Sequence, residues 1–216
     1  MMNQNTRLPG FTGHVCVLDV GSHAKLGWAM EGAAPRDGRD LDGCIAAVAA
    51  ALAEGPVALG FEAPLFVPYR NDPLALSRAR DGECPPGRRP RPFSAQAGAT
   101  VATIATVVAP YALRRLRQAA PATRVTLDWT VPMTGAGDLL LFEAFVTDQP
   151  AGRDDPHVAD ARLAARTLLS ALRSGRVLTS VRAEPCFNLL GAALLRTGWT
   201  SDLGVLAAPL LVVRPA

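Results

Sequence analysis

Three apolar segments, separated by helix-like stretches, constrain the fold of this chain more than any other feature. They are rich in valine, leucine and phenylalanine and are bounded by glycine or proline: HVCVLDVGS (14–22), VALGFEAPL (57–65) and DLLLFEAFV (138–146). Short runs of this kind are typical of buried β-strands. Helical patterns lie between or after them, at residues 41–55, 94–118 and 154–173. Strands that alternate with helices predict an α/β sheet with helices packed against it.

The remaining segments predict further strands and helices of the same sheet. The segment KLGWAM (25–30) predicts a hairpin with the first strand, and a short third strand is expected near residues 36–40. The helix at 94–118 is predicted to be interrupted near Pro110, and a last strand-helix-strand run is predicted for 176–214. With 216 residues and 49% hydrophobic content, the chain is predicted to form one domain over 1–216, with an Arg/Pro-rich insertion loop at about 66–93.

Charge and cysteine content narrow the function only slightly. The net charge of +3 permits a polyanionic partner but does not require one. The four cysteines are scattered, with no CxxC pair, which predicts reduced thiols and a cytoplasmic protein. The first residues lack an apolar signal core, and threonines and a proline break the longest apolar stretch, so no membrane span is expected.

Each of the three apolar segments carries one acidic residue. These residues are Asp19, Glu62 and Glu143. A buried carboxylate needs a cation or several hydrogen bonds to remain ionised, and Lys25 is the one lysine in the chain. A divalent cation held by oxygen ligands, Mg²⁺ or Mn²⁺, would meet that need.

A histidine and a further carboxylate lie on the apolar side of the helix that follows the third strand. Asp155 and Pro156 are typical of a helix start. Helical periodicity then places His157 and Asp160 beside Ala161, Ala164 and Leu168. Each of these polar residues alone has a structural explanation, such as a satisfied core histidine or an acid at a strand end. As a set, Asp19, Glu62, His157 and Asp160 indicate a metal site.

The order of these residues resembles the ribonuclease H-like superfamily. The pattern is an Asp on a first strand in LDVGS, a Glu at the end of a later buried strand in FEAPL, and His-x-x-Asp-Ala in HVADA (157–161). RuvC-type nucleases are similar in that last motif. The layout is also similar to an uncharacterised family of predicted nucleases of this fold, in which a Glu lies in a later strand, here LFEAF. The resemblance implies a ribonuclease H-like mixed sheet with flanking helices.

The resemblance also implies roles for individual residues. Asp19 would bridge two metal ions, Glu62 would hold one of them, and His157 with Asp160 would complete the ligand shell, so that Asp19, Glu62 and Asp160 form the catalytic set. Glu143 would be either a further metal ligand or a structural residue. The implied function is metal-dependent hydrolysis of DNA or RNA by a two-metal mechanism. The alternative is a catalytically silent ribonuclease H-like domain that binds a partner.

The insertion loop offers a candidate nucleic-acid interface. It carries five arginines and an aromatic residue at its end: Arg78, Arg80, Arg88, Arg89, Arg91 and Phe93. Phosphate contacts and base stacking would suit a nucleic acid strand that crosses the metal site. A solvated loop in an arginine-rich chain explains the same residues, and both interpretations stay open.

Overall fold

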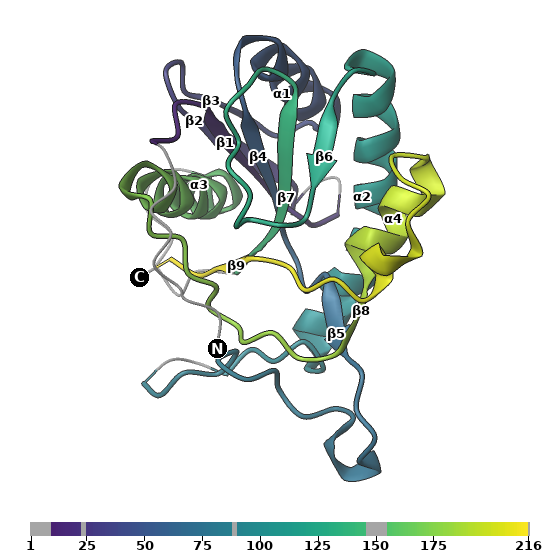
Figure 1. Cartoon of the computed structure of the whole chain (residues 1–216). Helices are drawn as coiled ribbons and strands as arrows, with labels where there is room; N and C mark the ends of the chain where they lie inside the picture. Colours follow the sequence, from purple (N-terminus) through teal and green to yellow (C-terminus); the bar gives the residue numbers. More distant parts are fainter. Residues whose placement is uncertain (1–9, 23–24, 88–89, 146–154, 216) are drawn as a thin grey trace.

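A mixed β-sheet lies between two layers of helices in the computed structural model (Figure 1). The structure describes residues 10–22, 25–87, 90–145 and 155–215. The sheet has seven strands, in the order β3-β2-β1-β4-β7-β6, and β9 also pairs with β7. The antiparallel part consists of β1 (His14–Asp19), β2 (Gly27–Glu31) and β3 (Arg36–Gly38). The strands parallel to β1 are β4 (Val57–Glu62), β7 (Asp138–Ala144), β6 (Arg124–Thr126) and β9 (Val212–Val213).

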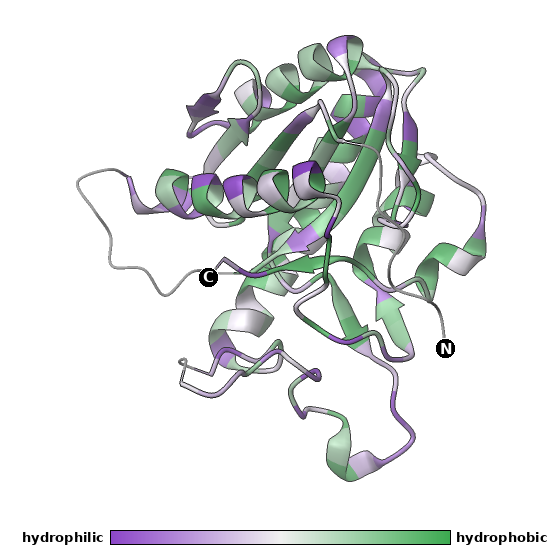
Figure 2. Cartoon of the chain, turned by 60° about the vertical axis from the view of Figure 1, so that its left-hand side comes forward, coloured by the Kyte–Doolittle hydropathy of each residue, from purple (hydrophilic) through white to green (hydrophobic). Residues whose placement is uncertain are grey.

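The helices cover the two faces of the sheet unequally. One face is covered by α1 (Leu41–Glu54), α2 (Gln96–Ala119) and α4 (Leu189–Thr197), and the other face by α3 (Pro156–Ser174). The predicted α/β architecture with a mixed sheet and flanking helices is therefore confirmed. The central strands of the sheet are coloured largely as hydrophobic in Figure 2, because both faces of β1, β4 and β7 are buried.

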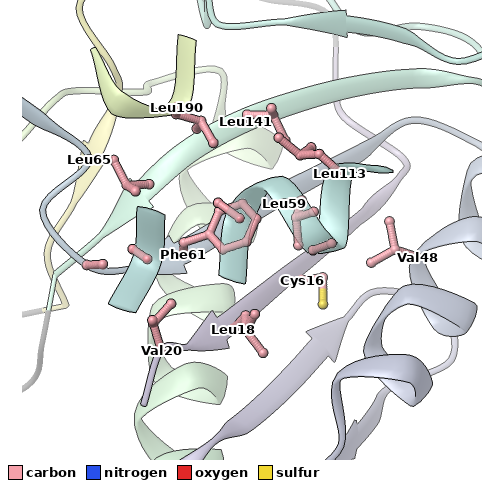
Figure 3. Close-up of a cluster of buried hydrophobic side chains, with 14 of the residues drawn as sticks. Cys16, Leu18, Val20, Val48, Leu59, Phe61, Leu65, Leu113, Leu141 and Leu190 are labelled. Carbon is pink, nitrogen blue, oxygen red and sulfur yellow. The ribbon is translucent and has the colours of Figure 1, made fainter. Parts of the chain in front are cut away.

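Alternation along the strands decides which side chains meet which helices. In β1, Cys16 and Leu18 point toward the α1 and α2 layer, and Figure 3 shows them with Phe61 in that core. Val15 and Val17 point the other way, into the core under α3. Successive side chains of a strand alternate between faces, so Asp19 lies on the α3 side.

Helix α2 differs from its predicted form because it continues through Pro110 without a break. Proline lacks the amide proton that would bond to the carbonyl four residues earlier. That residue is Thr106, which is exposed, so water can satisfy its carbonyl and the helix tolerates the proline.

The same helix is the one described helix that is long and apolar enough to cross a membrane, judged by length and composition, with 22% of its apolar window buried. A core helix of a soluble protein passes the same test, so this is weak evidence for a span. The expectation of no membrane span stays a prediction.

The segment at 66–93 is more ordered than the expected surface loop. Its first residues form β5 (Phe66–Pro68), which pairs antiparallel with β8 (Cys186–Asn188) in a separate two-stranded sheet, and a 3₁₀ turn follows at Pro73–Ala75. Arg70 holds the next turn together, since its guanidinium donates to the carbonyl oxygens of Ala75 and Arg78 and to the carboxylate of Glu184. Internal arginine bonds therefore organise this insertion.

Candidate functional site

Asp19 and Glu62 end two neighbouring parallel strands and lie side by side. They are the last residues of β1 and β4 and are direct partners in the register of the two strands. Both are buried, with 9% and 6% of their surface exposed. Because partners in register point to the same face, both carboxylates lie on the α3 side. The structure thus places these two acids next to each other at the carboxyl ends of adjacent parallel strands.

The start of α3 brings an imidazole to Asp19. The Asp155 side chain caps the helix by accepting from the backbone amide of His157 at 3.0 Å, and Pro156 occupies the first turn. This fixes the backbone of His157, whose Nδ1 lies 2.5 Å from Oδ2 of Asp19. Asp160, one turn further along, acts electrostatically on both Asp19 and Glu62. The helix therefore turns His157 and Asp160 toward these two strand ends.

Gly27 makes this approach possible. It is the register partner of Asp19 on β2. A Cβ at this position would lie 2.8 Å from the carbonyl carbon and the Cβ of His157 and from the backbone nitrogen of Val158. The backbone of α3 therefore lies directly on the strand at Gly27. The sequence alone did not reveal this role.

Replacing Gly27 with alanine should push the start of α3 away from the sheet and lower stability by about 1–3 kcal/mol, because backbone atoms cannot move aside as a side chain can. The matched control is Gly55→Ala, where a Cβ meets nothing within 4 Å; it should be neutral or slightly stabilising. Urea unfolding of both variants measures the difference. Equal stability of the two variants would show that α3 does not rest on Gly27.

Burial governs the electrostatics of the strand ends. It raises the pKa of Asp19 from 3.8 to about 6, and the neighbouring Asp160 adds to this, while the contact with His157 works in the opposite direction. Burial also raises the pKa of Glu62 well above its usual value, with further increases from Asp19 and Asp160 and a decrease from the positive charge of Arg91. When Asp19 and Glu62 are ionised at neutral pH, their buried charges therefore lower the stability of the folded protein.

Stability should consequently fall as the pH rises from about 4 to about 7 in metal-free buffer. The pKa of Asp19 is higher in the folded state than in the unfolded state, so the folded protein binds more protons in this window and loses that advantage as the carboxyl ionises.

Asp160→Asn removes one repelling charge and should raise the melting temperature at pH 8 by about 2–4 °C, equivalent to about 1 kcal/mol. Thermal unfolding in EDTA at pH 5 and pH 8 tests both statements. A markedly lower melting temperature of the Asp160→Asn variant would instead identify Asp160 as a structural hydrogen-bond acceptor.

Glu143 does not join the other acids. Its register partner on β4 is Phe61, one residue before Glu62, so its side chain lies on the opposite face of the sheet. There it is ion-paired with Arg80 at 2.6 Å and accepts from the backbone amide of Leu65 at 2.9 Å. Of the two roles expected for Glu143, the structure supports the structural one and removes this residue from the ligand set.

The predicted nucleic-acid-binding residues have different surroundings. Arg80 is 2% exposed and its guanidinium is bound by Glu83 and Glu143, so its burial removes it from any surface that a nucleic acid could reach. Arg78 is exposed, Arg91 and Phe93 are partly buried, and Arg88 and Arg89 lie outside the described residues. The buried pairing of Arg80 had no local sequence signal, because its partner on β7 is 63 positions away.

The donor atoms suit a hard cation, but the side chains as they stand do not enclose one. Over residues 10–22, 25–87, 90–145 and 155–215, no group of three or more His, Cys, Asp or Glu side chains is arranged so that it could hold a metal ion. Asp19 is engaged by His157 instead. Against this, Oε2 of Glu62 is buried without a hydrogen-bond partner among the described residues. A buried carboxylate oxygen with no partner is costly, and Mg²⁺ or Mn²⁺ prefers oxygen donors of this kind.

The four cysteines are free thiols: Cys16, Cys44, Cys84 and Cys186. Cys16 and Cys44 are buried beside each other, with their sulfur atoms 3.7 Å apart, on the face of the sheet away from the carboxylates. Their thiols therefore have no part in this site.

No protein-family model matches the chain, and neither a curated protein nor a solved structure matches it.

Proposed function

We propose that the chain is a metal-dependent nuclease with a ribonuclease H-like fold, and that Asp19, Glu62 and Asp160 form its catalytic centre. The observation that carries the proposal is the grouping of acids from β1, β4 and α3 at the carboxyl ends of two central strands. One of these acids, Glu62, has a buried oxygen without a hydrogen-bond partner among the described residues. Carboxyl ends of parallel strands are a common place for sites in α/β sheets.

The sheet supports the finer fold assignment. An antiparallel hairpin unit, β1 to β3, is followed by the strands β4 and β7 parallel to β1, with the acids at the ends of β1 and β4 and a helix start facing them. This agrees with the order of motifs that resembles the ribonuclease H-like superfamily. The placement of His157 three residues before Asp160, both toward the sheet, supports the similarity to RuvC-type nucleases.

Asp19, Glu62 and Asp160, with His157, would hold Mg²⁺ or Mn²⁺. When bound, the cation supplies Lewis-acid chemistry for hydrolysis of a phosphodiester. The chain itself keeps Asp19 and Glu62 in fixed positions through the paired ends of β1 and β4. His157 orients the carboxylate of Asp19 through the 2.5 Å contact, and α3 covers this face of the sheet.

The test is cleavage by the purified full chain. Labelled single-stranded DNA, branched DNA and single-stranded RNA are incubated with Mg²⁺, with Mn²⁺ or with EDTA. We expect cleavage with either cation and none with EDTA, and the preferred substrate then identifies DNA or RNA. If nothing is cut and titration calorimetry detects no metal binding at millimolar concentrations, the protein is instead a silent binding module. The engagement of Asp19 by His157 is the observation that favours that second function.

A further inference from the structure

A groove of about 500 Å³ lies between the second half of α3 and the end of β2. Figure 1 shows α3 alone on its face of the sheet, so no other described helix lies over this groove. Its lining comes from six residues: Glu31, Arg166, Leu169, Ser170, Arg173 and Ser174. Leu169 is the one apolar residue in this set, and a lining of charged and hydroxyl groups favours a polar ligand.

The helical repeat brings the hydrogen-bond donors of the groove to one side of α3. Arg166, Ser170 and Arg173 are spaced by four and then three residues, and side chains at these spacings share a face of a helix. Arg166 and Arg173 are roughly 10 Å apart along the helix axis, a distance that two long side chains can span together. Two guanidinium groups and a hydroxyl therefore border the same groove.

Glu31 orients the first of these arginines. Its buried carboxylate accepts from Nε of Arg166 at 3.1 Å. This is the one side-chain bond of Arg166 to a described residue, so the terminal nitrogens of its guanidinium are left for a ligand. Nε of Arg162 lies 3.8 Å from the same oxygen of Glu31, so the negative charge of Glu31 faces two cations.

The other two donors are not used inside the described part of the protein. Ser170 and Arg173 are exposed, and neither side chain has a hydrogen bond or ion pair with a residue that the structure describes. Ser174 differs, because its hydroxyl donates to the carbonyl oxygen of Ala171 at 2.9 Å. With two arginines against one glutamate, the lining carries a net positive charge.

We propose that this groove binds a phosphate group through Arg166, Ser170 and Arg173. A guanidinium presents a planar set of N–H donors that matches phosphate oxygens. The tetrahedral oxygens of a phosphate can accept from donors on several sides at once, whereas the two oxygens of a carboxylate lie in one plane. The phosphate belongs either to a nucleic acid backbone or to a small phosphate ester. The inference does not depend on the proposed nuclease function, because no residue of the groove belongs to the carboxylate site.

The experiment is titration calorimetry of the full chain in EDTA, with inorganic phosphate, acetate and a single-stranded oligonucleotide as probes. The wild type should bind phosphate at least about 10-fold more tightly than acetate. Arg173→Gln should weaken phosphate binding by about 10-fold, as expected for loss of one charge-assisted hydrogen bond. Its melting temperature should not change, because Arg173 has no partner among the described residues. Arg173→Lys should recover part of the loss. The matched control is Arg115→Gln, an exposed arginine on α2, on the other face of the sheet, and it should bind as the wild type does.

The oligonucleotide identifies the source of the phosphate. If Arg173→Gln also weakens oligonucleotide binding and reduces its salt slope by about 0.7, the value for one phosphate contact, the groove holds a nucleic acid backbone. If Arg173→Gln changes the affinity for phosphate but not for the oligonucleotide, the ligand is a small phosphate ester. The inference is overturned if neither probe binds in a way that depends on Arg173. Binding of acetate as tight as that of phosphate also overturns it.

Discussion

Replacing Asp19 with asparagine should reduce metal-dependent cleavage at least about 100-fold, roughly 2.7 kcal/mol of transition-state stabilisation. Asp19 is the register partner of Glu62 and the contact of His157, so it is the acid that joins the strand ends to α3. Asparagine keeps the shape of the side chain but loses the charge that a cation requires. Single-turnover cleavage with saturating Mn²⁺ measures the effect without a contribution from product release.

The fold and the binding of nucleic acid should survive this change. The pKa of about 6 for Asp19 shows that its ionised form is unfavourable in the folded protein, so the neutral side chain should preserve or raise stability in metal-free buffer. The matched control is Asp42→Asn, an exposed position on α1, which should cut as the wild type does. Cleavage that persists in Asp19→Asn would assign the activity to a contaminating nuclease or to another site.

Replacing Arg80 with methionine should lower the free energy of unfolding by about 3–5 kcal/mol. The carboxylates of Glu83 and Glu143 are almost completely buried, at 1% exposure each, and Arg80 is their cation. Burial opposes the charged form of Arg80, but the two carboxylates outweigh it and raise the pKa of the guanidinium. Methionine fills a similar volume and leaves both acids without a counter-ion. Urea unfolding at pH 7.5 measures the loss.

Two further variants show whether the loss comes from uncompensated charge. Arg182→Met breaks the pair between Arg182 and Asp81, whose side chains are 81% and 63% exposed, and should cost less than about 1 kcal/mol. Adding Glu83→Gln and Glu143→Gln to Arg80→Met should restore part of the stability, because the buried charges are removed and the oxygen of each amide can still accept one backbone bond. If Arg80→Met is as mild as Arg182→Met, the ion pairs of Arg80 with Glu83 and Glu143 do not stabilise the fold.

Local periodicity was sufficient to place the acid of β1 and the polar residues of α3. The two-residue period puts Asp19 on the face of Val15 and Val17, and the helical period puts His157 and Asp160 beside the apolar side of α3. Both patterns depend on a few consecutive residues only, so the structure agrees with what they predict. The acid-capped start of α3 at Asp155 was predictable for the same reason.

The position of Glu143 could not be read in that way. Its sequence context, an acid near the end of an apolar strand, looks like that of Glu62. The two strands pair so that Glu62 is opposite Ala144 and Glu143 is opposite Phe61, and an offset of one residue exchanges the faces. The register is set by the packing of whole strands, which no short motif contains.

The sequence by itself thus determined the alternating strands and helices, the acids at two strand ends and the inward side of α3. The tertiary structure alone decided the strand order, the passage of α2 through Pro110 and the buried ion pairs of Arg80 with Glu83 and Glu143. The physical reason is the range of the interactions. Periodicity and capping act within a few residues, whereas a buried charge such as Arg80 must find its partners wherever the fold places them, here across 63 positions of sequence.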